Sequence, residues 1–309
     1  MSFLTRINYM RYAKQMLGFC VVTVILSLVA VGVLGLNTGI DFTGGDLLDI
    51  QFTGQVTSSQ VEQAAEGILG TVPQVQQVEA IGDNADQVTE FLIRTPEMSP
   101  EVRTQFMNAM EEISSITVVS ETNVSATISR ELTMNALLAL GIAVLLQVIY
   151  IWFRFELKFG VTAVVALVHD VIITLGVMSL LQIQLNSTFV AAILTVLGYS
   201  MNDTIVVFDR IRENLHKRKK GEDLEELATR SIQEVITRSL YTGVSVIMVL
   251  IALLIWGGAT LQDFTATLLI GTIAGTYSSV CVATTLWLFW AKADEGKKRE
   301  KVARKPARA

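Results

Sequence analysis

The residues of this chain that could carry chemistry are a few ionisable side chains inside long apolar runs. Asn202 and Asp203 interrupt one such run, in the stretch GYSMNDTIVVFDRIREN at 198–214. A central Asp costs about 2.5–3.5 kcal/mol to insert into a membrane, whereas an interhelical hydrogen bond returns about 0.6 kcal/mol. Because the cost exceeds the gain, we predict an ion-path role for Asp203 rather than packing alone. Tyr199, Thr195 and Ala192 recur at helical spacing before it, so we expect this face to point into a bundle.

Arg238 is a second candidate, at the cytoplasmic start of a later apolar run. Glu234, Thr242 and Ser245 recur on its face at helical spacing, which predicts a polar stripe. With the topology argued below, Arg238 and Asp203 are expected at similar depth on neighbouring helices. A nearby cation favours the ionised carboxylate, whereas burial favours the neutral acid. A carboxyl group balanced between these effects can load and release a proton when a helix shifts.

A third ionisable pair, His169 and Asp170, lies inside another apolar run. Ala163, Ala166 and Thr174 share the helical face of Asp170 and are again small or polar. From the residues alone, an ion-path role and interhelical packing are both open for Asp170, as they are for the arginine.

The composition gives little support to metal, disulfide or nucleophile chemistry. His169 and His216 are the two histidines of the chain, which excludes a histidine-rich metal site. Cys20 and Cys281 both fall inside apolar runs, where we expect them to be small buried side chains. We therefore predict a protein that is not an enzyme, with no catalytic residue, no metal and no cofactor besides a coupling ion.

The apolar runs are long enough to cross a membrane. Hydrophobic residues make up 51% of the chain and charged residues 17%, against about 25% charged residues in a soluble domain. A bilayer core needs about 20 apolar helical residues, and six runs qualify. We predict spans at 17–36, 134–153, 161–181, 188–208, 238–256 and 264–290. The first is longer than the roughly 7–15 residues of a signal-peptide core, so we expect it to be retained. In the sixth, Gly271 and Gly275 form a helix-packing pair.

Lys and Arg are distributed unevenly between the connections, and this predicts the orientation. They concentrate in segment 1–16, in the second-to-third and fourth-to-fifth connections, and in the tail at 291–309. The short loops at 182–187 and 257–262 carry none. We therefore predict that both termini are cytoplasmic. The basic runs are topology determinants, so we predict no nucleic-acid partner.

The segment between the first two spans, 37–131, is expected to form an extracytoplasmic α+β domain. Strand-like patterns at 46–52, 75–81, 88–94 and 116–120 are combined with helical patterns at 57–69 and 99–113. Thr57 and Ser58 are candidate N-caps, and Pro100 suits the first turn of the second helix. The order β-α-β-β-α-β is that of a ferredoxin-like unit. The predicted fold class is a polytopic α-helical membrane protein with six transmembrane helices and this one domain.

Three motifs, taken in order, resemble those of a known family. GLNTGIDFTGG at 35–45 closes the first span, VHD at 168–170 lies in the third, and GYSMNDTIVVFDRIREN closes the fourth. With six spans and an outer domain between the first two, the chain resembles the SecF side of the SecD/SecF family of protein-export membrane proteins. That family belongs to the resistance–nodulation–division superfamily of proton-coupled membrane proteins. The resemblance extends from about residue 10 to about residue 290.

The resemblance implies a subunit of the Sec protein translocase accessory complex in the bacterial inner membrane. Such a subunit pairs with SecD and uses the transmembrane proton gradient to assist translocation after the ATP-dependent step of SecA. The implied ion-path residues are Asp203 and Arg238, and Asn202 and Asp170 are further candidates. The implied joint to the outer domain contains Gly39, Asp41, Gly44 and Gly45.

The resemblance also implies partners for the chain. They are SecD, the SecY-containing translocon, YajC, YidC, the unfolded polypeptide in transit and membrane lipid. The coupling ion is expected to be the proton, and sodium is the alternative, because a carboxylate with amide and hydroxyl neighbours can serve either ion. Two other functions stay open: a proton-coupled exporter of small molecules or lipids, and a passive assembly scaffold.

Overall fold

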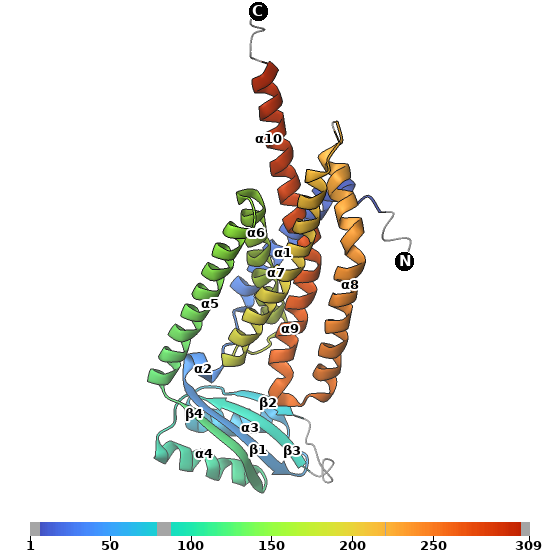
Figure 1. Cartoon of the computed structure of the whole chain (residues 1–309). Coiled ribbons are helices and arrows are strands. Elements are labelled where there is room, and N and C mark those ends of the chain that lie inside the picture. The colour runs from blue at the N-terminus through green and yellow to red at the C-terminus, as the bar shows by residue number, and fades with distance from the viewer. Residues whose placement is uncertain (1–6, 79–87, 220, 304–309) are drawn as a thin grey trace, which may run out of the picture. The chain divides into compact units, whose positions relative to one another are not determined.

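The computed structural model describes residues 7–78, 88–219 and 221–303. The chain forms two compact units (Figure 1). The helical unit consists of Met1–Asn37, Ala139–Gln184 and Thr188–Ala309. The α/β unit consists of Thr38–Leu138 and Leu185–Ser187.

Within the described residues, six helices are long and apolar enough to cross a membrane. The first is α1 (Ala13–Leu34), preceded by the short 3-10 turn η2 (Tyr9–Tyr12). Next come α5 (Ala126–Arg154), α6 (Leu157–Leu181), α7 (Ser187–His216) and α8 (Leu224–Trp256). The last is built from α9 (Ala259–Ser278), η4 (Ser279–Thr284) and α10 (Thr285–Ala303). The polytopic helical class predicted from the apolar runs is confirmed.

The inside of the helical unit is formed by α6, α7 and the last helix. Along their most apolar stretches, half of the residues of α6 and of α7 are buried, and 61% of those of the last helix, against 6% in α5. Small residues allow close approach: a Cβ added to Gly176 of α6 would lie 2.2 Å from the Cβ of Ser27 in α1.

Two helices extend well beyond the apolar runs that predicted them. α8 begins at Leu224 rather than near 238, and α7 continues past 208 to His216. The added turns of α8 are amphipathic, because Leu227 and Ile232 are buried while Arg230 forms an ion pair with Glu222. Hydropathy detects the uniformly apolar part of a helix, so it misses amphipathic turns of this kind.

The α/β unit has the element order that the sequence predicts. Its elements are β1 (Gly45–Thr53), α3 (Ser58–Leu69), β2 (Gln74–Val78), β3 (Val88–Thr95), α4 (Pro100–Ile113) and β4 (Ile116–Val124). The strands form one antiparallel sheet in the order β2-β3-β1-β4 (Figure 1). The predicted extension of the second strand to 81 falls outside the described residues.

One face of this sheet carries the core of the α/β unit. Alternation along β1 and β3 buries Leu48, Ile50, Phe52, Phe91 and Ile93 on the same face. That face packs against α3 and α4 through Val61, Ala65, Phe106 and Met110. Thr57 is the N-cap of α3 as predicted, and the Gln60 side chain completes a capping box by accepting from the Thr57 N–H at 2.9 Å.

Candidate functional site

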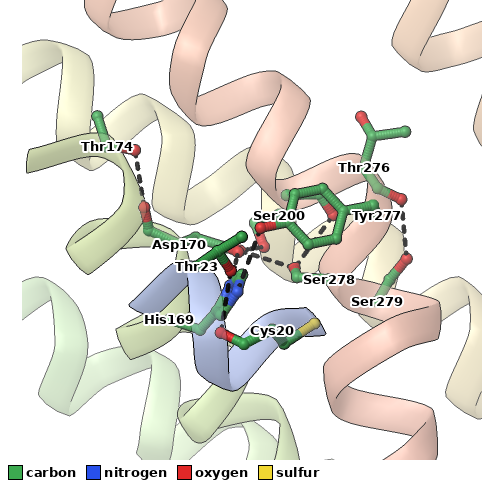
Figure 2. Close-up of polar contacts among 11 residues, drawn as sticks. Cys20, Thr23, His169, Asp170, Thr174, Ser200, Thr276, Tyr277, Ser278 and Ser279 are labelled. Atoms are coloured by element: carbon green, nitrogen blue, oxygen red, sulfur yellow. Dashed lines mark hydrogen bonds and ion pairs between the residues drawn. The ribbon is translucent and has the colours of Figure 1, made fainter. Parts of the chain in front are cut away.

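Asp170, in the middle of α6, is fully buried and hydrogen-bonded through both carboxylate oxygens (Figure 2). Oδ2 accepts from Ser200 Oγ of α7 at 2.5 Å and from Ser278 Oγ of α9 at 2.9 Å. Oδ1 lies 3.0 Å from Nδ1 of His169. One carboxylate therefore joins α6, α7 and the last helix.

His169 extends this polar group toward α9 and α1. Its Nε2 lies 3.2 Å from the hydroxyl of Tyr277, and the two rings meet edge to face. The Tyr277 ring also contacts Phe19 of α1, with centroids 6.3 Å apart. Figure 2 shows Tyr277, Cys20 and Thr23 gathered around the His169–Asp170 pair. The face of small and polar residues predicted around Asp170 is buried, at Ala163, Ala166 and Thr174.

In the helical unit, Asp203 of α7 is a second buried carboxylate, with 8% of its surface exposed. Its Oδ2 accepts from Ser279 Oγ at 2.6 Å. Ser278 and Ser279 are consecutive, so adjacent serines of the last helix serve Asp170 and Asp203 respectively. A buried carboxylate that is held by a hydroxyl in this way can bind a proton or a small cation if the bond opens.

The face of α7 that points inward differs from the predicted one in one respect. Ala192 is buried, but Thr195 is exposed and bonds the carbonyl of Ala191 at 2.8 Å. The buried line instead runs through Val196 and Ser200 to Asp203. Steps of three and of four residues both stay on one helical face. The prediction stepped back from Asp203 in steps of four residues and so reached Thr195, whereas the buried face is reached by a step of three, at Ser200.

Two glycines set the register between α7 and α9. A Cβ on Gly271 would lie 2.4 Å from Val196 Cγ2, and a Cβ on Gly275 would lie 2.8 Å from Ser200 Cβ. The helix-packing function predicted for this pair is confirmed. Ser278 and Ser279 lie about one helical turn beyond Gly275. The close packing at Gly275 therefore places their hydroxyls beside the carboxylates.

The structure does not place the side chains of Arg238 and Asn202 inside the bundle beside the Asp203 carboxylate. Both side chains are exposed, and no ion pair joins Arg238 to Asp203 in the part of the chain that the structure describes. Within the polar stripe of Arg238, Glu234 forms an ion pair with Arg210 of α7 at 2.6 Å. The ion-path role of Arg238 and Asn202 therefore stays a prediction.

The joint residues lie in a compact turn of the α/β unit that includes the four-residue helix α2 (Ile40–Thr43). The N–H of Gly39 donates to the carbonyl of Leu185 at 2.7 Å, and the Asp41 carboxylate accepts from the N–H of Ser187 at 2.6 Å. Gly44 has φ +76°. Gly45 has φ +130°, and a Cβ there would lie 2.3 Å from the carbonyl oxygen of Thr95, so glycine is required.

Sequence reasoning missed the hydroxyl partners Ser200, Ser278 and Ser279. A usable signal existed for Ser200 alone, because it lies three residues before Asp203 on the same face. The described residues contain no group of three or more His, Cys, Asp and Glu side chains that could hold a metal ion. Cys20 and Cys281 are free thiols.

Comparison with known proteins gives one consistent result. The family model described as "Protein export membrane protein SecD/SecF, C-terminal" matches residues 104–293. A protein translocase subunit SecF of Sebaldella termitidis is 36% identical over 291 residues, which cover 93% of this chain and 92% of that protein. A protein translocase subunit SecDF of Bacillus subtilis is 35% identical over 84% of this chain and 34% of its own length.

A crystal structure of SecDF from Thermus thermophilus, described as a translocon-associated membrane protein, has the same fold. Its TM-score is 0.82 at 33% identity, and the match covers 93% of this chain. The chain spans 39% of the length of that SecDF protein.

Six spanning helices, a small α/β unit and carboxylates buried between helices define a polytopic membrane protein with ionisable groups inside its bundle. The relatives reported above identify the family within that class. The chain belongs to the SecD/SecF family of protein-export membrane proteins and is a SecF-type subunit of the protein translocase.

Proposed function

We propose that this subunit uses the transmembrane proton gradient to drive or complete protein translocation, with Asp203 as the residue that binds the coupling ion. The observation that carries the proposal is a carboxylate in a spanning helix, 8% exposed and held by the hydroxyl of Ser279 in a neighbouring helix. Ionisable groups in such positions are costly and usually serve ion pathways. Asp170 is proposed as a further carboxylate of the same path.

The energy available from one proton is sufficient for a conformational bias. A unit charge that crosses 100 mV yields about 2.3 kcal/mol, which shifts a two-state equilibrium about fiftyfold. Loss of charge at Asp203 weakens its bond with Ser279, so the packing of α7 against the last helix would respond to the ion. Movement of the α/β unit through the Gly39–Gly45 joint would follow.

Arg238 is proposed to approach Asp203 in another state of the cycle. Its helix already meets α7 and α9 about 7 Å further along. There, a Cβ on Gly243 would lie 3.0 Å from Thr276 Oγ1 and 3.3 Å from the Tyr199 hydroxyl. A small rotation of α8 at this contact would turn the exposed guanidinium toward the bundle.

SecDF relatives that contain both halves in one chain support SecD as the partner. We further propose a location in the bacterial inner membrane with both termini cytoplasmic, and an extracytoplasmic, ferredoxin-like α/β unit. The SecY-containing translocon, YajC and YidC are proposed neighbours, and the unfolded polypeptide is the substrate. The names of the relatives favour protein export over a small-molecule or lipid exporter.

Replacement of Asp203 by Asn tests the ion-binding role, because the amide keeps the size and the acceptor oxygen but removes the charge. Asp203→Asn should co-purify with SecD normally and lose the gradient-dependent part of export. Asp209→Asn is the matched control on the same helix, since Asp209 is partly exposed and bonds Arg154 at 3.2 Å. Normal gradient-dependent export by Asp203→Asn would reject the proposed role.

A further inference from the structure

The last spanning helix is not a regular α-helix where it meets the two carboxylates. Ser279–Thr284 forms a π-helical turn between α9 and α10. A π-turn accommodates one extra residue, is rare, and occurs frequently at functional sites. This one begins at the residue that bonds Asp203.

Buried hydroxyls of the helix itself stabilise this turn. Thr284 Oγ1 donates to the carbonyl of Ser279 at 2.8 Å, and Thr285 Oγ1 donates to the carbonyl of Val280 at 3.3 Å. Both threonines are fully buried. These bonds span five residues, so they fit the wide turn and satisfy carbonyls that an α-helix would pair differently.

Each serine at the start of the turn has two acceptors within reach. Ser278 Oγ lies 2.9 Å from Asp170 Oδ2 and 3.3 Å from the carbonyl of Gly275. Ser279 Oγ lies 2.6 Å from Asp203 Oδ2 and 3.3 Å from the carbonyl of Thr276. A hydroxyl has one hydrogen, so it favours the stronger acceptor, which is the carboxylate while that is charged. When the carboxylate is neutral, the backbone carbonyl becomes competitive.

Other ionisable groups also face the two carboxylates. His169, Tyr277 and Cys20 lie around Asp170, and Tyr199 lies near Asp203. Within the described residues, no Lys or Arg side chain forms an ion pair with either carboxylate. Hydroxyl donors from the last helix are therefore prominent among the groups that stabilise the two charges.

We infer that Ser278 and Ser279 are positioning residues that couple the charge of Asp203 to that of Asp170 through the π-turn. This rests on the proposed ion path. A proton that binds Asp203 releases the Ser279 hydroxyl toward its own helix, and the adjacent Ser278 shifts with the same backbone. The bond from Ser278 to Asp170 then lengthens, so proton binding at one carboxylate favours proton binding at the other.

The test is the pH titration of both carboxyl groups in the full-length chain in lipid nanodiscs. Infrared carboxyl bands are followed against pH, and Asp170→Asn and Asp203→Asn assign the bands. Ser279→Ala should move the midpoint of Asp203 upward by about one pH unit, because a donor to the charged form is lost. It should also move the midpoint of Asp170 upward, although Ser279 does not contact Asp170.

Two further variants make the result specific. Ser279→Thr keeps the hydroxyl and should restore both midpoints. Ser245→Ala removes a hydroxyl that donates to the Tyr241 carbonyl at 2.7 Å on α8, and should move neither midpoint. If Ser279→Ala moves the Asp203 midpoint alone, or neither, the coupling is overturned. This readout does not use export, so it can fail while the export test of Asp203→Asn succeeds.

Discussion

At the scale of single residues, Asp170 and Asp203 are held in different ways. Asp170 is fully buried and bonded by His169, Ser200 and Ser278. Asp203 keeps 8% exposure and accepts from Ser279. Exchange of an ion with the outside needs access and few bonds to break, so Asp203 is the better candidate for the proposed ion exchange. Asp170 is better suited to respond to it.

The buried acids could be predicted from the sequence, but their partners could not. An Asp inside an apolar run stands out because insertion is costly, so Asp170 and Asp203 were found without a structure. A serine in such a run costs little, and Ser278 and Ser279 therefore leave no signal. The exposure of Arg238 was also not predictable, because helix rotation depends on packing that a periodic pattern does not encode.

Asp49 of the α/β unit gives a prediction about pH and stability. It lies on the sheet face opposite the core, where burial and the neighbouring Glu90 carboxylate raise its pKa to about 6. The unfolded value is about 3.9, so the folded state holds the proton more tightly. Stability should therefore fall as the pH rises from about 4 to about 6 and stay level above. Asp49→Asn should remove this fall and stabilise the sheet at neutral pH by about 1 kcal/mol, given partial solvent screening.

Hydrogen exchange of the β1 and β3 amides in the full-length protein measures this, after correction for intrinsic rates. Asp46→Asn is the contrasting variant, because the Asp46 carboxylate accepts from the N–H of Met98 at 2.8 Å and from Asn123 at 2.6 Å. It should destabilise the same sheet at neutral pH. A pH dependence in Asp49→Asn equal to that of the unchanged protein would contradict the assignment.

At the scale of elements, the contact between α7 and α9 determines the geometry of the site. Gly271→Ala would place a Cβ 2.4 Å from Val196, and such overpacking costs about 1–3 kcal/mol. We expect a lower thermal midpoint in detergent and weaker gradient-dependent export, since Ser279 would move from Asp203. Gly141→Ala on α5 is the matched control, because a Cβ there meets nothing within 4 Å.

A second substitution tests the cause of the Gly271→Ala effect. Adding Val196→Ala removes the two methyl groups in closest conflict, so the double variant should recover part of the thermal midpoint. If Gly271→Ala is as stable as Gly141→Ala, the close approach of α7 and α9 is not what positions the serines.

Elements with strong periodicity were predictable, and irregular ones were not. The β-α-β-β-α-β order and the Gly271–Gly275 contact follow from alternation and spacing. The helix α2 has four residues, which is too short for a periodic signal. The π-turn at Ser279–Thr284 has the same apolar composition as an α-helix, so hydropathy cannot distinguish the two.

At the scale of the whole molecule, the helical unit presents much apolar surface outside its core. The most apolar stretches of α1 and α5 are 11% and 6% buried, and large side chains such as Val33, Trp152 and Phe153 are exposed. Lipid accounts for such surface in a membrane protein, and the proposed SecD half would cover part of it. A subunit of this kind is expected to be more stable in the complex than alone.

A proton gradient acting through Asp203 is proposed to drive the export step of this subunit. The most direct measurement is protein export into inverted membrane vesicles that contain this chain and SecD, with a proton gradient, a sodium gradient or neither imposed. We predict that export after the ATP-dependent step rises with the proton gradient alone and is lost in Asp203→Asn. Export that is independent of both gradients would contradict the account, and export that follows sodium alone would contradict the proton assignment.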